Sequence, residues 1–263
     1  MRIRPTVAAV FLATALSASV IPAAAHAADR AAAGDTTFSD VVVNGGKDIV
    51  LGLSTKKTVT IRWTATDQDG VAASWAYLWH GPHTDDADGI LPAYPPAGTC
   101  TVSSADPTTS VCQVGFGVDA ARDFDDNGLA GTWKVLAEAQ DAGDDWTDVD
   151  VAATARFKRY AKVTVNASPE PVKKGRTITV TGKLTRADWR SGTYTGYRGQ
   201  AVQLQFRTKG SSTYSTLETV TSGSGGSLKA TTKAKRDGYF RFVFAGTGTT
   251  GPATAAGDFV DVK

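Results

Sequence analysis

Apolar and polar residues alternate with a period of two through much of this chain, and this pattern most constrains its fold. Val59, Ile61 and Trp63 alternate with polar residues from Thr58 to Thr64. The same spacing recurs at Trp75, Tyr77 and Trp79, at Trp133, Val135 and Ala137, at Val151, Ala153, Ala155 and Phe157, at Ile178 and Val180, at Val202, Leu204 and Phe206, and at Phe240, Phe242 and Phe244. Such alternation is typical of half-buried strands. No stretch keeps a 3.6-residue period, so we predict an all-β chain.

Turn residues separate these segments at short intervals. Asp69-Gly70, Asn127-Gly128, Ser224-Gly225-Gly226 and Asp237-Gly238 each favour a tight turn. The chain also has 27 Gly, 10 Pro and far more Asp than Glu, a composition that favours strands and turns over helices. Short strands joined by turns over 263 residues predict two antiparallel β-sandwiches.

The two halves carry opposite charge. Residues 28–160 contain 10 Lys and Arg against 20 Asp and Glu, and residues 161–263 contain 16 against 6. This asymmetry, near the proline-rich segment Ser168–Pro171, predicts an acidic domain over 28–160 and a basic domain over 161–263. The basic half then has the charge to hold an anionic cell-envelope polymer or polysaccharide. Alternatively, both surfaces are only solvated or dock on each other.

The first residues are typical of an export signal. Arg2 and Arg4 precede an uncharged run from Val7 to Ile21, and Ala25-His26-Ala27 supplies a small-x-small cleavage pattern. We therefore predict a signal peptide over residues 1–27 and a secreted, extracellular protein whose mature form is not inserted in a membrane.

Cys100 and Cys112 are the only cysteines. In an oxidising compartment the simplest prediction is one disulfide bond, and the alternative is a reactive or metal-bound thiol pair.

Three segments of the second half resemble a known module. They are KKGRTITVTGKLTR from Lys173, VQLQFR from Val202 and DGYFRF from Asp237, and they resemble the bacterial immunoglobulin-like module of secreted actinobacterial proteins. The resemblance covers about residues 161–263, and the first half is similar to a more divergent member. It implies two tandem immunoglobulin-like sandwiches with a non-catalytic role in adhesion, spacing or presentation. The cysteine pair and the Asp-rich loops of the first half are not part of the common pattern.

The first metal-site candidate is the loop from Asp123 to Gly128. Asp123, Asp125 and Asn127 stand at positions one, three and five, and Gly128 at position six permits a sharp turn. The loop is not an EF-hand, since position twelve is Lys134 rather than Glu. A calcium site completed by Asp119 is one interpretation, and an Asx turn is the other.

A second acidic cluster combines Asp67 and Asp69 with Asp141 and Asp144. In an immunoglobulin-like order these residues fall on two loops that meet at one end of the sandwich. Either calcium neutralises the carboxylates or they stay apart in solvent.

The sequence argues against an enzyme. His80 and His83 are the only histidines after residue 27, and the Gly-Pro between them favours a turn over a zinc site. Nucleophile-elbow, P-loop and dinucleotide motifs are absent from the sequence. A small secreted hydrolase using Asp clusters remains an alternative.

One loop combines aromatic rings with arginines: Trp189, Arg190, Tyr194, Tyr197 and Arg198. Such rings stack on sugars and Arg pairs with anions, so a carbohydrate-binding accessory role is an alternative. The other interpretation is that Trp189 and Tyr197 fold back onto the sandwich.

The charge of the basic half does not indicate a nucleic-acid partner, because nucleic acid does not suit an exported protein. The main prediction is a secreted, non-enzymatic binding or structural protein, stabilised by calcium, at the cell envelope or extracellular matrix.

Overall fold

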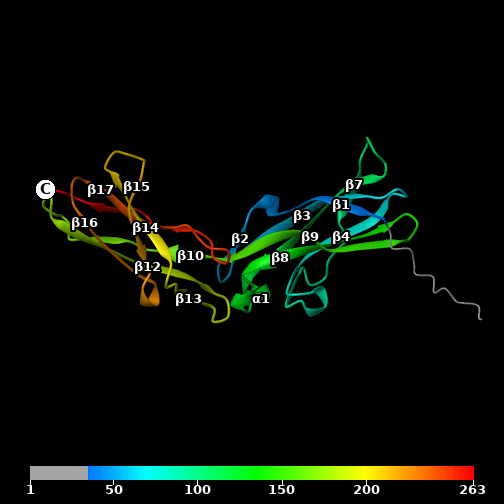
Figure 1. The fold of residues 1–263 in the computed structure, drawn as a ribbon, viewed down its shortest axis with the longest axis horizontal. Helices are drawn as coiled ribbons and strands as arrows, with labels where there is room; N and C mark the ends of the chain where they lie inside the picture. The colour runs from blue at the N-terminus through cyan, green and yellow to red at the C-terminus, as the bar shows by residue number, and fades with distance from the viewer. Residues whose placement is uncertain (1–34) are drawn as a thin grey trace, which may run out of the picture. The chain divides into compact units, whose positions relative to one another are not determined.

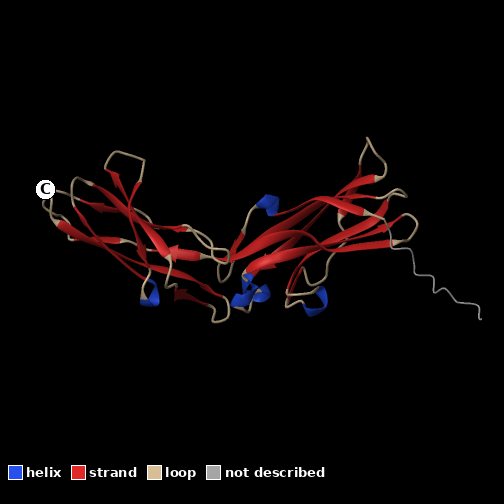
Figure 2. Ribbon diagram, in the orientation of Figure 1, coloured by secondary structure: helices blue, strands red, loops and turns tan. Residues whose placement is uncertain are grey.

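A computed structural model of the protein describes residues 35–263, and the predicted signal peptide lies outside them (Figure 1). Within this range strands dominate (Figure 2). The helical elements are short: α1 (Ala120–Asp123), η1 (Asn44–Gly46), η2 (Thr84–Asp86), η3 (Asn127–Leu129) and η4 (Ser224–Gly226). None of the helices in residues 35–263 is long and apolar enough to cross a membrane. The prediction of an all-β fold is confirmed.

Two sheets enclose the core of the first sandwich. Its strands are β1 (Thr37–Val43), β2 (Ile49–Leu51), β3 (Lys56–Thr66), β4 (Val71–His80), β5 (Gly89–Leu91), β6 (Thr99–Val102), β7 (Thr109–Asp119), β8 (Gly131–Asp141) and β9 (Trp146–Arg159). One sheet has the order β1-β3-β7-β6 and the other β2-β9-β8-β4-β5. Every pair is antiparallel except β2 with β9, which is parallel.

The second sandwich is also built from two sheets. Its strands are β10 (Ala161–Val163), β11 (Asn166–Ser168), β12 (Thr177–Asp188), β13 (Thr193–Gly196), β14 (Ala201–Thr208), β15 (Ser215–Thr221), β16 (Ser227–Lys233), β17 (Gly238–Phe244), β18 (Ala253–Thr254) and β19 (Asp258–Val260). The long strand β12 pairs with β10, β11, β13 and β16. The other sheet has the order β15-β14-β17-β18, with β19 also on β17. Both halves thus have the immunoglobulin-like sandwich architecture.

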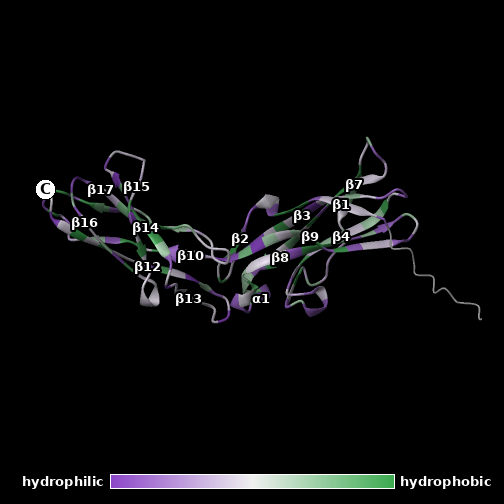
Figure 3. Cartoon of the chain, viewed as in Figure 1, coloured by the Kyte–Doolittle hydropathy of each residue, from purple (hydrophilic) through white to green (hydrophobic). Residues whose placement is uncertain are grey.

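Buried residues alternate with more exposed ones along β3 and β17, as the sequence predicts, and hydrophobic and polar stretches are mixed along the strands (Figure 3). Val59, Ile61 and Trp63 of β3 are buried in the first core, and Phe240, Phe242 and Phe244 of β17 are buried in the second.

Strand β4 differs from the alternation that its sequence suggests. Its smaller residues Ala76 and Leu78 face the core, while Trp75 and Tyr77 lie half-exposed on the other face. Both sets are apolar, so the period alone does not decide which set is buried.

Buried apolar residues form two clusters, one in each sandwich. The first cluster also contains Ala187 and Trp189, which come from the end of β12 and the turn after it. Residues 35–263 lie within one compact unit. The division into domains after residue 160 therefore stays a prediction.

Candidate metal centre

Two turns of the first sandwich are held side by side: the β3–β4 turn, which connects the two sheets, and the turn of the β8–β9 hairpin. The β3–β4 turn begins at Asp67 and the β8–β9 turn at Asp141. They meet because β4 pairs with β8 so that Val71 lies opposite Asp141. The amide of Ala142 then donates to the carbonyl of Gly70 at 2.9 Å. This pairing brings acidic residues that are more than 70 positions apart to the same end of the sheet.

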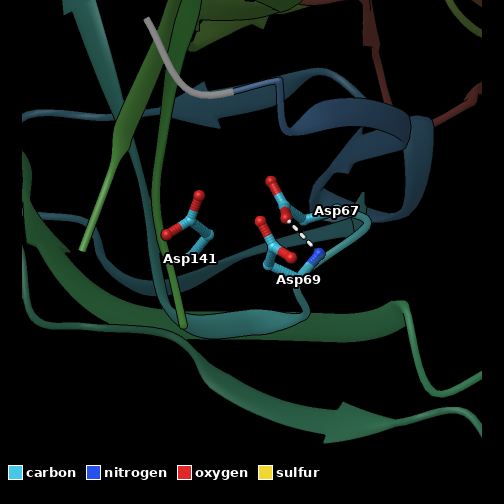
Figure 4. Close-up of side chains that lie close together, drawn as sticks. All are labelled: Asp67, Asp69 and Asp141. Carbon is cyan, nitrogen blue, oxygen red and sulfur yellow. Dashed lines mark hydrogen bonds between the residues drawn. The ribbon is translucent and has the colours of Figure 1, made fainter. Parts of the chain in front are cut away.

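Asp67, Asp69 and Asp141 form the acidic triad of this end. One carboxylate oxygen of each lies within 4.8 Å of the others (Figure 4). Asp67 and Asp141 are only 2% and 3% exposed, whereas Asp69 is exposed. The triad therefore combines two fixed, buried carboxylates with one at the surface.

Hydrogen bonds fix the two buried carboxylates. Asp67 accepts from the Thr36 hydroxyl at 2.6 Å and from the amide of Asp69 at 2.9 Å. One oxygen of Asp141, Oδ1, accepts from the amides of Gly143 and Asp145 at 2.7 and 2.9 Å. Each turn thus presents its carboxylate by bonding it to its own backbone.

The triad has no cationic neighbour at ion-pair distance. In residues 35–263 none of the ion pairs involves Asp67, Asp69 or Asp141. Three neighbouring carboxylates without a counter-charge repel one another, and a hard divalent cation with oxygen ligands would remove that repulsion.

Asp144, predicted with this cluster, lies outside the triad. Its backbone is left-handed, with φ 69°. Its carboxylate accepts from the Gln140 amide at 3.1 Å.

The loop from Asp119 to Gly128 uses its acidic groups differently. Asp119 caps α1 through the amide of Ala121 and pairs with Lys56 at 3.2 Å, and the hydrogen bond from Lys56 lowers the pKa of the Asp119 carboxyl. Asp123 accepts from the amide of Asp119 and pairs with Arg122.

Asn127, the third residue predicted in that loop, faces the second sandwich. Its amide donates to Asp188 at 2.9 Å, and its oxygen accepts from the Trp189 amide at 3.0 Å. Among the described residues, then, the structure groups Asp67, Asp69 and Asp141, and it does not group Asp119, Asp123, Asp125 and Asn127. Calcium binding at either place stays a prediction.

The aromatic loop of the second half contacts the first half. Trp189 is 6% exposed, packs on Phe124 with ring centroids 4.7 Å apart, and donates to the carbonyl of Gly52 at 3.3 Å. Its ring therefore has no free face for a sugar. Tyr194 lies under Lys162 and Tyr197 under Arg186, at 3.5 and 3.8 Å.

Of the five residues predicted as a binding group in this loop, only the two arginines are exposed. Arg190 and Arg198 are both open to solvent. Trp189 thus folds back, as one of the two interpretations expected, but onto the first core. That destination could not be predicted from the loop itself, because the partners of Trp189 lie more than 60 residues away.

The remaining sequence candidates are located as follows. Cys100 and Cys112 form a disulfide bond between facing positions of β6 and β7, as predicted. His80 binds Asp88 through Nδ1. His80 and His83 do not form a metal-ligand group with other described residues.

Comparisons with known proteins assign no family. Neither a protein-family model nor a curated protein matches the chain. Among solved structures, fibronectin(III)-like modules of Clostridium thermocellum CbhA match at 12% identity over 86% of this chain and 92% of that one, with a TM-score of 0.36. The D00-D0 domain of Intimin matches at 15% identity over 84% and 98%, with a TM-score of 0.28. A bacterial ice-binding adhesin matches at 12% identity over 88% and 67%, with a TM-score of 0.29. These scores leave the function to be argued from the chain's own residues.

Proposed function

We propose that this protein is an extracellular, non-enzymatic binding or structural protein whose first sandwich is stabilised by calcium at Asp67, Asp69 and Asp141. The observation that carries the calcium proposal is the convergence of three carboxylates from two turns, with no cation of residues 35–263 at ion-pair distance. Calcium prefers such oxygen ligands and tolerates irregular geometry, so backbone carbonyls and water would complete its shell. Bound calcium would clamp the β3–β4 turn to the β8–β9 turn.

Thermal unfolding in millimolar calcium and in EDTA tests this proposal. A ligand that binds only the folded state stabilises it by about 2.7 kcal/mol at 100 times its Kd. We expect calcium to raise the Tm of the unaltered protein and to have no effect on Asp69→Asn. The Asp69 side chain is exposed, so its replacement leaves the packing intact.

Two matched variants locate the ion. Asp144→Asn removes the same charge from a neighbouring turn and should keep the calcium response. Asp125→Asn should keep it as well. Loss of the response in Asp125→Asn but not in Asp69→Asn would move the site to the loop after α1, and an unchanged Tm in all four proteins would reject calcium.

A row of exposed lysines favours a second candidate function, the binding of an anionic envelope polymer or polysaccharide. Lys183 of β12 and Lys229 and Lys233 of β16 are exposed on paired strands. In this register they lie on the face opposite Val180 and Ala230, which are buried. Salt-sensitive retention on immobilised polygalacturonate or teichoic acid should be lost when all three lysines become Glu. Retention that is unaffected by salt and by the three substitutions would reject the proposal.

A further inference from the structure

The outer face of the first sandwich carries an aromatic and acidic surface that the proposed function does not use. We call it the acidic face: Trp75 and Tyr77 of β4, Glu138 of β8, and Trp146, Asp148 and Asp150 of β9. Trp75 stacks on Trp146 with ring centroids 5.3 Å apart and planes at 22°, and Trp146 is 52% exposed. Beside them, a hollow of about 340 Å³ is lined by Trp75, Tyr77, Ile90, Ala93, Pro95 and Glu138.

The charge of the acidic face is not neutralised within the chain. Glu138 lies opposite both Trp75 and Asp148 in the sheet. Burial raises the pKa of the Glu138 carboxyl, and the charge of Asp148 raises it further. None of its three carboxylates takes part in an ion pair of the described chain.

One cation of this sheet, Lys134 of β8, is engaged elsewhere. Lys134 lies over the ring of Trp79 at 4.0 Å and donates to the carbonyl of Gly81 at 2.7 Å. The acidic face therefore combines aromatic rings with excess negative charge, which is the chemistry that binds guanidinium and ammonium groups.

The second sandwich carries a surface of the opposite charge on the outer face of β14, β17 and β19. We call it the basic face: Arg207 of β14, Tyr239 and Arg241 of β17, Phe259 of β19, and Lys209 and Tyr214 of the loop after β14. Lys209 already pairs with Asp237, at 3.8 Å. Arg207 lies over Tyr239 at 3.8 Å, and Arg241 lies over Tyr214 at 3.6 Å. Tyr239 also packs on Phe259, at 5.1 Å between ring centroids.

Ring stacking holds the two guanidiniums in place but leaves most of their N–H groups without a protein acceptor. Arg207 donates to the carbonyl of Ser211 at 2.8 Å, and Arg241 donates to Gln205 at 3.0 Å. Neither arginine has a carboxylate at ion-pair distance in residues 35–263. Each guanidinium has five N–H donors, so both are available for carboxylates from outside the chain.

We propose that the acidic face of one copy binds the basic face of a second copy, so that the protein self-associates head to tail. Each face supplies what the other lacks, namely carboxylates beside rings on one and fixed guanidiniums beside rings on the other. A second copy is the partner because it presents the complementary face at equal concentration. A contact between two different faces is heterologous, so it leaves one free face at each end and adds further copies. This association goes beyond the proposed function and does not depend on calcium.

Sedimentation velocity at increasing protein concentration tests the proposal. In about 20 mM salt the average mass should rise with concentration, and in about 500 mM salt it should return to that of one chain because screening weakens the charge pairing. The acidic-face variant Asp148→Asn with Asp150→Asn, and the basic-face variant Arg207→Gln with Arg241→Gln, should each remain a single chain.

A mixture of the two variants is the decisive sample. It retains one intact acidic face and one intact basic face, so it should form a 1:1 pair that grows no further. Trp146→Ala changes no charge and removes an exposed ring, and it should also weaken association. Far-ultraviolet circular dichroism and a thermal melt establish that every variant is folded.

Two controls match the charge changes away from both faces. Lys183→Glu reverses a charge on β12 and Asp125→Asn removes one beside α1, and both should associate like the unaltered protein. The same runs in EDTA separate this proposal from calcium binding. A single chain at all concentrations in low salt, or a variant mixture that stays unpaired, would overturn it. The protein could also bind hexa-arginine at Trp146 and yet stay a single chain. That result would assign the acidic face to another basic partner and would equally overturn self-association.

Discussion

Arg159 is a buried cation at the boundary of the two sandwiches, and no carboxylate of residues 35–263 lies at ion-pair distance from it. It is 5% exposed, and its Nε has no hydrogen-bond partner. Burial lowers the pKa of its guanidinium to about 10, and the charge of Arg186 contributes to the shift. The backbone at this position is well held, because its amide donates to Thr249 at 3.0 Å and its carbonyl accepts from Gly251 at 2.9 Å. The side chain, rather than the backbone, is therefore the unfavourable part.

We expect Arg159→Met to leave the free energy of unfolding unchanged or to raise it by about 1 kcal/mol, because an apolar residue of similar length avoids the desolvation of an unpaired charge. Urea denaturation at pH 7 measures this. Arg186→Met is the matched comparison and should instead destabilise by about 1 kcal/mol, since Arg186 stacks on Tyr197. A loss above 2 kcal/mol in Arg159→Met would mean that its guanidinium has a stabilising partner.

Asp188, in contrast to Arg159, stabilises the folded protein, and its contribution depends on pH. The hydrogen bond from Asn127 is the largest cause that lowers the pKa of its carboxyl, and bonds from Ser191 add to it. A carboxyl whose pKa is lower in the folded protein stabilises it fully above the unfolded pKa of about 3.9, and that stabilisation is lost as the pH falls through the folded pKa. We expect Asp188→Asn to be less stable than the unaltered protein at pH 7 and to approach it at about pH 2. Urea unfolding at both values tests this, and a constant difference would contradict it.

At the scale of the strands, the sequence pattern predicts where a strand lies in the chain better than which of its faces is buried. The alternation locates β3, β8, β12, β14 and β17 because their apolar sets alternate with polar residues. In β4 the alternation is between aromatic and smaller apolar residues, so only tertiary packing decides that Ala76 and Leu78 fill the core.

The same limit applies to the candidate metal centre. The carboxylates at Asp67, Asp69 and Asp141 are brought together by strand pairing, which an immunoglobulin-like order predicts. The spacing of Asp123, Asp125 and Asn127 is local and suggests a cation loop, but Arg122, Asp188 and Trp189 engage its side chains instead. Competition from residues distant in sequence is not visible in a short motif.

A disulfide bond links the two strands of the β6–β7 hairpin. Cys112 is buried in the first core and Cys100 packs against it, while the segment between them is largely exposed. Closing a loop of about 13 residues stabilises a fold by about 3 kcal/mol in the chain-entropy model. We expect the Cys100→Ala, Cys112→Ala double variant to lose about that free energy of unfolding. The unaltered protein under strong reductant should lose the same free energy of unfolding. A loss below 1 kcal/mol would show that the hairpin is held mainly by its strand pairing.

At the scale of the whole chain, one hairpin connects the two hydrophobic cores. Trp189 contributes its ring to the first core, although its strand β12 is central to the second sandwich. Asn127 bonds both Asp188 and the Trp189 amide, so the connection is polar as well as apolar. Because unfolding of either sandwich would expose this ring, the stabilities of the two are coupled.

We therefore expect calorimetry of the unaltered protein to show a single transition, and Trp189→Ala to show two. Removing a buried tryptophan costs about 3–5 kcal/mol, and here that loss falls on the side-chain contact shared by the two sandwiches. If the carboxylates of the first sandwich bind calcium, the ion should raise the temperature of the single transition in the unaltered protein. In Trp189→Ala it should raise the temperature of only one of the two transitions. Trp146→Ala is the control, since this exposed ring joins no core, and it should keep the single transition. Two transitions in the unaltered protein would show that the sandwiches unfold independently despite the shared ring.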